Sequence, residues 1–157
     1  MKILVVSDSH SSSRYLYEVY DTEKPDAICF LGDGLRGFLE FRDFGLPAGA
    51  DVYVVCGNCD YDYYGEYSDS AVAMIAGRRF FMAHGHTFGV RYGVERICRE
   101  AALSKCEYAL FGHTHQQTLR VCGNVTALNP GALQNGDYAV IKVDNGEPLI
   151  ELKKLRR

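Results

Sequence analysis

The chain has 157 residues, with 17 lysines and arginines against 20 aspartates and glutamates, so its formal net charge is −3. This length suits one domain with its own core, and the nearly neutral charge gives no reason to expect a nucleic-acid or membrane surface. No apolar run approaches the ~20 residues of a membrane span, and the apolar N-terminus is too short for a signal peptide, so we predict a single soluble domain, residues 1–157, in the cytoplasm.

The N-terminal half alternates apolar runs with helical patterns. Continuous apolar runs at residues 2–6, 27–31 and 52–56 predict strands that are buried on both faces. The spacing of apolar residues over 11–20 and 35–44 predicts the two helices between these strands. A β-α-β-α-β order of this kind favours a parallel sheet with crossover helices.

The C-terminal half is richer in strands. The runs at 71–75 and 78–83 flank an Ala-Gly pair and predict a hairpin. Residues 92–104 have the spacing of a helix, and 108–111 form another short apolar run. Beyond it, Gly-Asn, Gly-Asp and Asn-Gly pairs separate what we predict to be a series of antiparallel strands. The expected fold class is therefore α/β with a β-rich second half.

Residues of the metal-ligand type follow five of the predicted strands. They are Asp8, His10, Asp33, Asn58, His84, His86, His113 and His115. A single aspartate after a strand is more often a helix cap or turn residue, and a single histidine is more often a structural group. Five such strand ends together are harder to explain this way, because turns do not need histidine, and all five histidines of the chain lie here. In open α/β sheets these ends meet at the ligand site.

The chemistry of this set points to metal ions. Nitrogen and oxygen donors without an obvious thiolate favour manganese, iron or zinc over a structural cysteine-type zinc site. The number of candidate ligands exceeds the need of one tetrahedral ion. Two ions about 3.5–4 Å apart, joined by a shared carboxylate, would use all of them.

The motifs D-x-H, G-D, G-N-x-D, H-G-H and G-H-T-H, in this order, resemble those of the calcineurin-like metallophosphoesterases. The short chain and the cysteine in G-N-C-D are similar to the small prokaryotic phosphodiesterase branch of that superfamily. The resemblance implies a four-layer α/β/β/α sandwich of two mixed sheets with two metal ions. By motif, the first ion would be bound by Asp8, His10 and His115, and the second by Asn58, His84 and His113, with Asp33 bridging both.

The resemblance also implies an activity, hydrolysis of a small phosphodiester by a hydroxide that bridges the two ions. Asp33, Asn58 and His86 would then be the catalytic side chains. Manganese is the first choice of metal, with iron, nickel or zinc as alternatives. A homodimer or homotetramer is compatible with this interpretation. The rival is a non-catalytic scaffold on the same fold, like the retromer subunit, but every ligand position here carries a competent residue.

Two positions depart from the common family pattern. Many relatives have histidine where this chain has Cys59, which leaves the general acid open, with His86 as either that acid or a structural neighbour of the ligands. Cys59 and Asp60 are expected beside the metal ligands, with Asp60 bracing the turn by hydrogen bonds. The turn often written N-P-G-S ends here in Ala132.

Two further segments have alternative interpretations. The tyrosine-rich loop at 61–67 is either a packed or dimer-facing loop or a wall that stacks an aromatic leaving group. Cys56 and Cys59 form a C-x-x-C, which could be a redox pair. Against this, Cys56 ends an apolar strand, whereas redox cysteines lie at helix N-termini.

Overall fold

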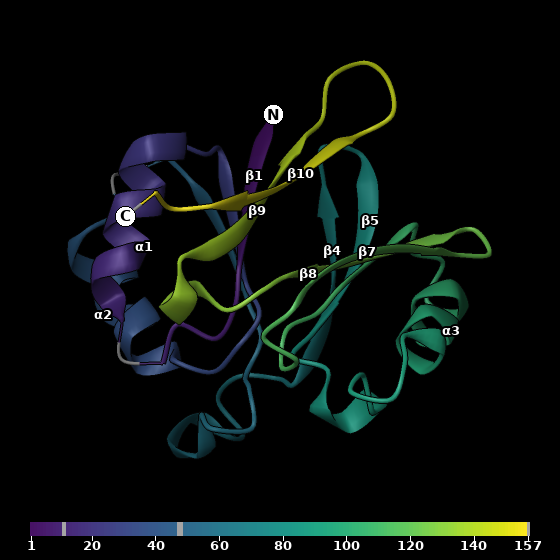
Figure 1. The fold of residues 1–157 in the computed structure, drawn as a ribbon, viewed down its shortest axis with the longest axis horizontal. Coiled ribbons are helices and arrows are strands. Elements are labelled where there is room, and N and C mark those ends of the chain that lie inside the picture. Colours follow the sequence, from purple (N-terminus) through teal and green to yellow (C-terminus); the bar gives the residue numbers. More distant parts are fainter. Residues whose placement is uncertain (11, 47–48, 157) are drawn as a thin grey trace.

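Two five-stranded mixed sheets lie face to face, and helices cover their outer faces (Figure 1). The computed structural model describes residues 1–10, 12–46 and 49–156. The predicted four-layer α/β/β/α arrangement of two mixed sheets is confirmed. Among the described residues, no helix combines the length and the apolar character needed to span a membrane.

The first sheet has the strand order β10-β9-β1-β2-β3. Its parallel centre follows from the crossover helices, and β9 then adds antiparallel to β1. The strands are β1 (Lys2–Val6), β2 (Ala27–Phe30), β3 (Asp51–Val54), β9 (Asp137–Lys142) and β10 (Leu149–Lys154).

The second sheet has the order β4-β5-β6-β8-β7, with β5, β6 and β8 parallel and the two edge strands antiparallel to their neighbours. The predicted hairpin is β4 (Ser70–Ile75) and β5 (Arg78–Ala83), and the remaining strands are β6 (Tyr108–Leu110), β7 (Gln117–Cys122) and β8 (Val125–Pro130).

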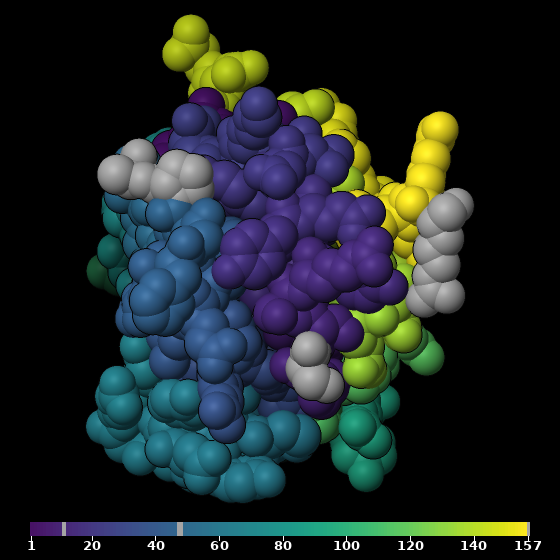
Figure 2. All heavy atoms as spheres, turned by 90° about the vertical axis from the view of Figure 1, so that its left-hand side faces the viewer, coloured from purple at the N-terminus to yellow at the C-terminus, as the bar shows by residue number. Residues whose placement is uncertain are grey.

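Helices α1 (Ser13–Glu23) and α2 (Leu35–Phe44) cover the first sheet, and α3 (Glu95–Leu103) covers the second. Figure 2 shows the face that α1 and α2 form, with the segment after β3 along its lower edge. Single 3-10 turns lie at η1 (Tyr61–Tyr63), η2 (His86–Phe88) and η3 (Leu133–Asn135).

The alternation of side chains along β1 explains the layers. Ile3 and Val5 pack between the two sheets, in a cluster that includes Phe80, whereas Leu4 and Val6 pack under α1 and α2. Successive strand residues point to opposite faces, so a run that is apolar throughout must be covered twice. A third cluster joins the second sheet to α3.

Two predictions are corrected by the structure. The strands after β6 are not one antiparallel series, because β8 is parallel to β6 and β9 leaves for the other sheet. The Gly-Asp pair at 136–137 therefore marks a crossing between sheets rather than a hairpin. Helix α3 begins at Glu95 rather than at residue 92, since Gly93 has a φ of +153° outside the helical region. The predicted start of the first helix at Ser11 lies outside the described residues.

Candidate metal centre

The loops that follow β1, β2, β3, β5 and β6 meet at one edge of the sandwich. Backbone hydrogen bonds hold them together: the Asp8 N–H donates to Gly32 O, and the Gly112 N–H donates to His84 O, each at 2.9 Å. A hydrogen bond of 3.0 Å from the His113 N–H to Asp8 Oδ2 then connects the two sheets. The predicted ligands therefore face one region between the sheets.

The backbone is unusual at these positions. Of the described non-glycine residues, eight have positive φ, and five of them are predicted ligands: Asp8, His10, Asp33, His113 and His115. Positive φ is uncommon for such residues and costs on the order of 1 kcal/mol or more. Strain of this kind gathers at functional sites, and here it coincides with the predicted ligands.

The two buried carboxylates are held in the same way. Each has one oxygen anchored by a backbone N–H, Asp8 Oδ2 by His113 at 3.0 Å and Asp33 Oδ1 by Cys59 at 2.8 Å. Their free oxygens face histidines, since Asp8 Oδ1 lies 3.0 Å from His115 Nε2 and Asp33 Oδ2 lies 3.3 Å from His84 Nε2. The anchored oxygens orient the carboxylates, and the free ones are available as ligands.

Two glycines leave room for these carboxylates. A Cβ at Gly57 would lie 2.2 Å from Asp33 Oδ1, and one at Gly112 would lie 2.7 Å from Asp8 Oδ2 and 1.9 Å from Ser7 Oγ. No side chain fits at such distances, so the close approach requires glycine.

The protonation of His84 supports a cation between these groups. Its Nδ1 lies 2.7 Å from the carbonyl oxygen of Leu31 and donates to it, so its Nε2 faces Asp33 and Asp8. Burial alone would lower the pKa of His84, but the hydrogen bond to Asp33 and the negative charges of Asp8 and Asp33 raise it, so the surroundings favour positive charge at Nε2. Among the described residues, neither His84 Nε2 nor Asp8 Oδ1 has a hydrogen-bond partner, and both atoms are buried. Three inward-facing acceptors of this kind repel one another unless a proton or a metal ion lies between them. The donor set fits a divalent metal ion.

Three overlapping groups of ligand atoms lie here among the described residues, each with its atoms within 4.8 Å of one another. One contains Asp8, His10 and His115, and a second contains Asp8, Asp33 and His84. The third joins His10 and Asp33 to Cys59. Asp8, His10 and Asp33 each belong to two of these groups, so the bridging role of Asp33 stays a prediction.

Two predicted ligands are placed less directly. The ring of His113 lies 5.1 Å from that of His84, but its Nε2 accepts a hydrogen bond of 3.0 Å from Arg91 Nε. The Asn58 side chain is exposed and contacts Cys59 Sγ at 3.5 Å. Sequence reasoning missed Arg91, since it follows no predicted strand and belongs to none of the motifs.

Two buried side chains brace the ligand loops. Asp60 accepts hydrogen bonds of 2.7 to 2.9 Å from the backbone N–H groups of Asp33, Gly34, Leu35 and Gly57. Asn129, from the N-P-G turn, was not predicted as part of the site. Its Nδ2 donates to Gly112 O at 2.8 Å and to Thr114 Oγ1 at 3.0 Å. Asp60 thus fixes the loops of the first sheet, and Asn129 fixes the G-H-T-H loop of the second.

His86 lies beside the predicted ligands, with its ring 5.5 Å from that of His84. Its Nδ1 is buried without a partner. Burial, and then the charge of His84, lower the pKa of His86. A neutral ring with a free nitrogen suits either interpretation made from the sequence, a proton-transfer group or a structural neighbour.

The charges of the centre shift other pKa values. Burial alone would raise the pKa of Asp33, but the hydrogen bond and charge of His84 and the Cys59 N–H hold it well below its usual range. Burial, followed by the charge of nearby carboxylates, raises the pKa of both Cys56 and Cys59 to about 11. A redox pair needs a thiol with a lowered pKa, so these values argue against one.

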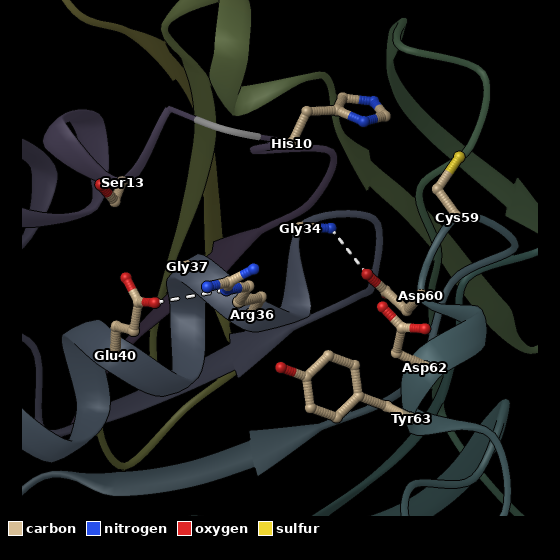
Figure 3. A pocket seen from close by; sticks show the side chains of 10 residues that line it. All are labelled: His10, Ser13, Gly34, Arg36, Gly37, Glu40, Cys59, Asp60, Asp62 and Tyr63. Atoms are coloured by element: carbon tan, nitrogen blue, oxygen red, sulfur yellow. Dashed lines mark hydrogen bonds and ion pairs between the residues drawn. The ribbon is translucent and has the colours of Figure 1, made fainter.

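Open hollows surround the centre. The groove in Figure 3, about 520 Å³, runs from His10 and Cys59 to Tyr63 and the start of α2. A second, of about 530 Å³, lies on the other side along Arg91, His113 and His115. In the 61–67 loop, Tyr63 packs against the core of the first sheet, as the packed-loop alternative expects, and it also lines the first groove. That the loop stacks an aromatic leaving group stays a prediction.

Comparisons with known proteins agree with this geometry. The model of the calcineurin-like phosphoesterase superfamily domain matches residues 1–146. A probable metallophosphoesterase of Bacillus subtilis, YsnB, is 26% identical over 153 residues, which cover 92% of this chain and 86% of the relative.

Solved structures share the fold. A predicted phosphoesterase from Streptococcus pneumoniae superposes with a TM-score of 0.77 at 26% identity, covering 98% of this chain and 88% of that one. An archaeal phosphodiesterase superposes with a TM-score of 0.68 at 21% identity, covering 98% of this chain and 100% of that one. A single mutant of Vps29 from Entamoeba histolytica superposes with a TM-score of 0.74 at 17% identity, covering 99% of this chain and 100% of that one. Below 25% identity the likeness concerns the fold, so the ligand set must decide the function.

Proposed function

This chain belongs to the calcineurin-like phosphoesterase superfamily, and we propose that it is a metal-dependent phosphodiesterase with two divalent ions at the centre described above. The observation that carries the proposal is the set of inward-facing atoms Asp8 Oδ1, Asp33 Oδ2 and His84 Nε2, of which the first and last are buried without a hydrogen-bond partner among the described residues. Buried polar atoms are normally paired, and a metal ion would satisfy all three atoms at once.

Two ions bound there would supply Lewis acidity, activating a water molecule near neutral pH and neutralising phosphoryl charge. Asp8, His10 and His115 would hold one ion, and Asn58, His84 and His113 the other, with Asp33 between them. Manganese remains our first choice, with iron, nickel or zinc as alternatives. The protein orients these ligands before the substrate arrives, because backbone N–H groups fix both carboxylates.

The chain contributes further groups for the substrate. Arg91 is exposed and lies at His113, where its guanidinium could bind a non-bridging phosphate oxygen. His86 faces the centre from the second sheet with a buried free nitrogen, which suits proton transfer to a leaving oxygen.

The shape of the surface favours a diester over a monoester. A phosphodiester carries two organic groups, and the centre lies between two open grooves of similar size. Tyr63 and Tyr64 line hollows on the side of the first sheet, where they could contact an aromatic leaving group. The archaeal phosphodiesterase of the same fold is consistent with this choice.

The test is hydrolysis of bis-p-nitrophenyl phosphate and p-nitrophenyl phosphate by chelator-treated protein after addition of manganese, zinc or no metal. We expect turnover only with metal and faster turnover of the diester. Elemental analysis should give two ions per chain. One ion at saturation would contradict the two-metal assignment, and faster monoester turnover would contradict the diester assignment.

The same measurement separates an enzyme from a scaffold. A scaffold that resembles the family only in fold would show no turnover with any metal, although its melting temperature could still rise with metal. If the metal raises the melting temperature and neither ester is hydrolysed, the catalytic proposal is wrong and the metal centre stands.

A further inference from the structure

Cys59 places a sulfur atom beside the metal centre, whereas all the predicted ligands are nitrogen or oxygen donors. Its Sγ, a ring nitrogen of His10 and a carboxylate oxygen of Asp33 lie within 4.8 Å of one another. Figure 3 shows His10 and Cys59 on the same rim of the groove. They come from the loops after β1 and β3, so this contact depends on the tertiary fold.

We propose that Cys59 is a thiolate ligand of the ion that His10 and Asp33 bind, and that it raises the affinity of this position for zinc relative to manganese. Two atoms bound to one ion at about 2.0 and 2.3 Å lie at most about 4.3 Å apart. The present separations are already below 4.8 Å, and because Cys59 is exposed and turns about a single χ1 angle, its sulfur can adjust toward this span.

The backbone keeps the sulfur near the bridging carboxylate. The Cys59 N–H donates to Asp33 Oδ1 at 2.8 Å, which leaves Asp33 Oδ2 facing the centre. The Cys59 side chain has a weak contact of 3.5 Å with the Asn58 amide and lies beside the Asp33 carboxylate. Any ion that Asp33 binds is therefore close to Cys59.

The neighbouring cysteine is placed differently. Cys56 is buried, and its Sγ contacts the carbonyl oxygens of Asp60 at 3.4 Å and Gly57 at 3.8 Å. It belongs to none of the ligand groups among the described residues. Cys56 thus has the same chemistry three positions earlier without access to the centre, and it provides a matched control.

Coordination by Cys59 forms a sulfur–metal bond and releases the thiol proton to solvent, with no oxidant or reductant involved. Thiolate is a soft ligand, which favours zinc over manganese relative to a set of imidazoles and carboxylates alone. It also adds a negative charge to the ion beside His10. The inference depends on the metal centre of the proposed function but not on hydrolysis.

Zinc K-edge X-ray absorption on the zinc-loaded full chain tests this inference. We expect a sulfur shell at about 2.3 Å in addition to nitrogen and oxygen at about 2.0–2.1 Å. The sulfur shell should be lost in Cys59→Ser and kept in Cys56→Ser. A wild-type spectrum with only nitrogen and oxygen would overturn the proposal, as would a sulfur shell that survives in Cys59→Ser.

Metal competition gives a second measurement. The ratio of zinc affinity to manganese affinity should fall at least ~10-fold in Cys59→Ser and stay unchanged in Cys56→Ser. An unchanged ratio in Cys59→Ser would contradict the selection of zinc. Diester hydrolysis by the manganese-loaded wild-type protein and by Cys56→Ser is measured in parallel. If neither hydrolyses the diester, the proposed function fails, while the sulfur shell and the affinity ratio still decide the present inference.

Discussion

The two sheets contribute different chemistry to the shared edge. Both carboxylates, Asp8 and Asp33, come from the first sheet and are buried, whereas four of the five histidines come from loops of the second sheet. Of these, His115 keeps 38% of its side chain exposed. The negative charge is thus fixed deep in one half, and most of the predicted histidine ligands approach it from the other. The centre exists only when the two sheets are packed together.

Each sheet also has its own brace. Asp60 accepts four backbone hydrogen bonds in the first sheet, and Asn129 holds the G-H-T-H loop of the second with a neutral amide. A charged acceptor makes stronger hydrogen bonds than a neutral group. We therefore expect substitutions of the charged and bracing residues of the first sheet to cost more activity and more stability than the corresponding substitutions in the second sheet.

Asp33→Asn should give the largest effect, because it removes the negative charge of the carboxylate that we propose to bridge both ions. We expect diesterase activity to fall at least ~10²-fold, which corresponds to about 2.7 kcal/mol or more in the barrier. The melting temperature of the metal-free protein should change little, since the core is formed by the apolar strands.

Asp62→Asn is the matched control, because Asp62 is a carboxylate beside the centre, in the lining of the first groove, and belongs to none of the ligand groups among the described residues; this variant should keep its activity. Near wild-type turnover in Asp33→Asn with two ions bound would contradict the mechanism. A drop in melting temperature without lost turnover would instead assign Asp33 to the turn.

The fold was predictable where the sequence pattern is local. The apolar runs gave the strands at 2–6, 27–31, 71–75 and 78–83 nearly as the structure has them. The path of β9 was not predictable, because its pairing with β1 joins residues about 140 positions apart and the turn residues at 136–137 are the same for a hairpin and a crossing. Turn chemistry specifies a change of direction, not the partner strand.

The site was predictable to a similar degree. The motifs identify residues that the fold does bring together, with Asp8, His10, Asp33, His84 and His115 in close groups. The sequence could not show that Asn129 braces the loop or that Arg91 reaches His113. Neither lies next to a ligand in the chain, and both contacts depend on how the sheets and loops pack.

Asp60→Ala tests the brace of the first sheet. Four backbone N–H groups lose their acceptor, and water can replace it only in part, so we expect a loss of about 2 kcal/mol in the free energy of unfolding. Urea unfolding of the metal-free protein measures it. Asp62→Ala, on the same loop and exposed, should lose almost nothing. Equal stabilities of the two variants would show that these hydrogen bonds do not hold the loop.

Asn129→Ala tests the brace of the second sheet, and its effect should be smaller, about 1 kcal/mol, because the lost hydrogen bonds are between neutral groups. The same urea experiment applies. If Asn129→Ala costs more than Asp60→Ala, the first sheet is not the more sensitive half. Metal affinity should fall in both variants, since each brace positions ligands.

Arg91→Gln should have the smallest effect and concerns the exposed rim of the second sheet. Its guanidinium donates to His113 Nε2 at 3.0 Å and is free to turn toward a phosphate in the second groove. Rim charges in water contribute on the order of 1 kcal/mol, so we expect kcat/KM for the diester to fall about fivefold. The loss should shrink at high salt, where exposed charges are screened. Arg36→Gln is the counterpart in the first groove, and it should leave kcat/KM unchanged because Arg36 already pairs with Glu40 at 3.5 Å. Equal losses of kcat/KM in the two variants would mean that positive charge in both grooves binds the diester. The two sheets would then differ in their metal ligands but not in how their grooves bind the substrate.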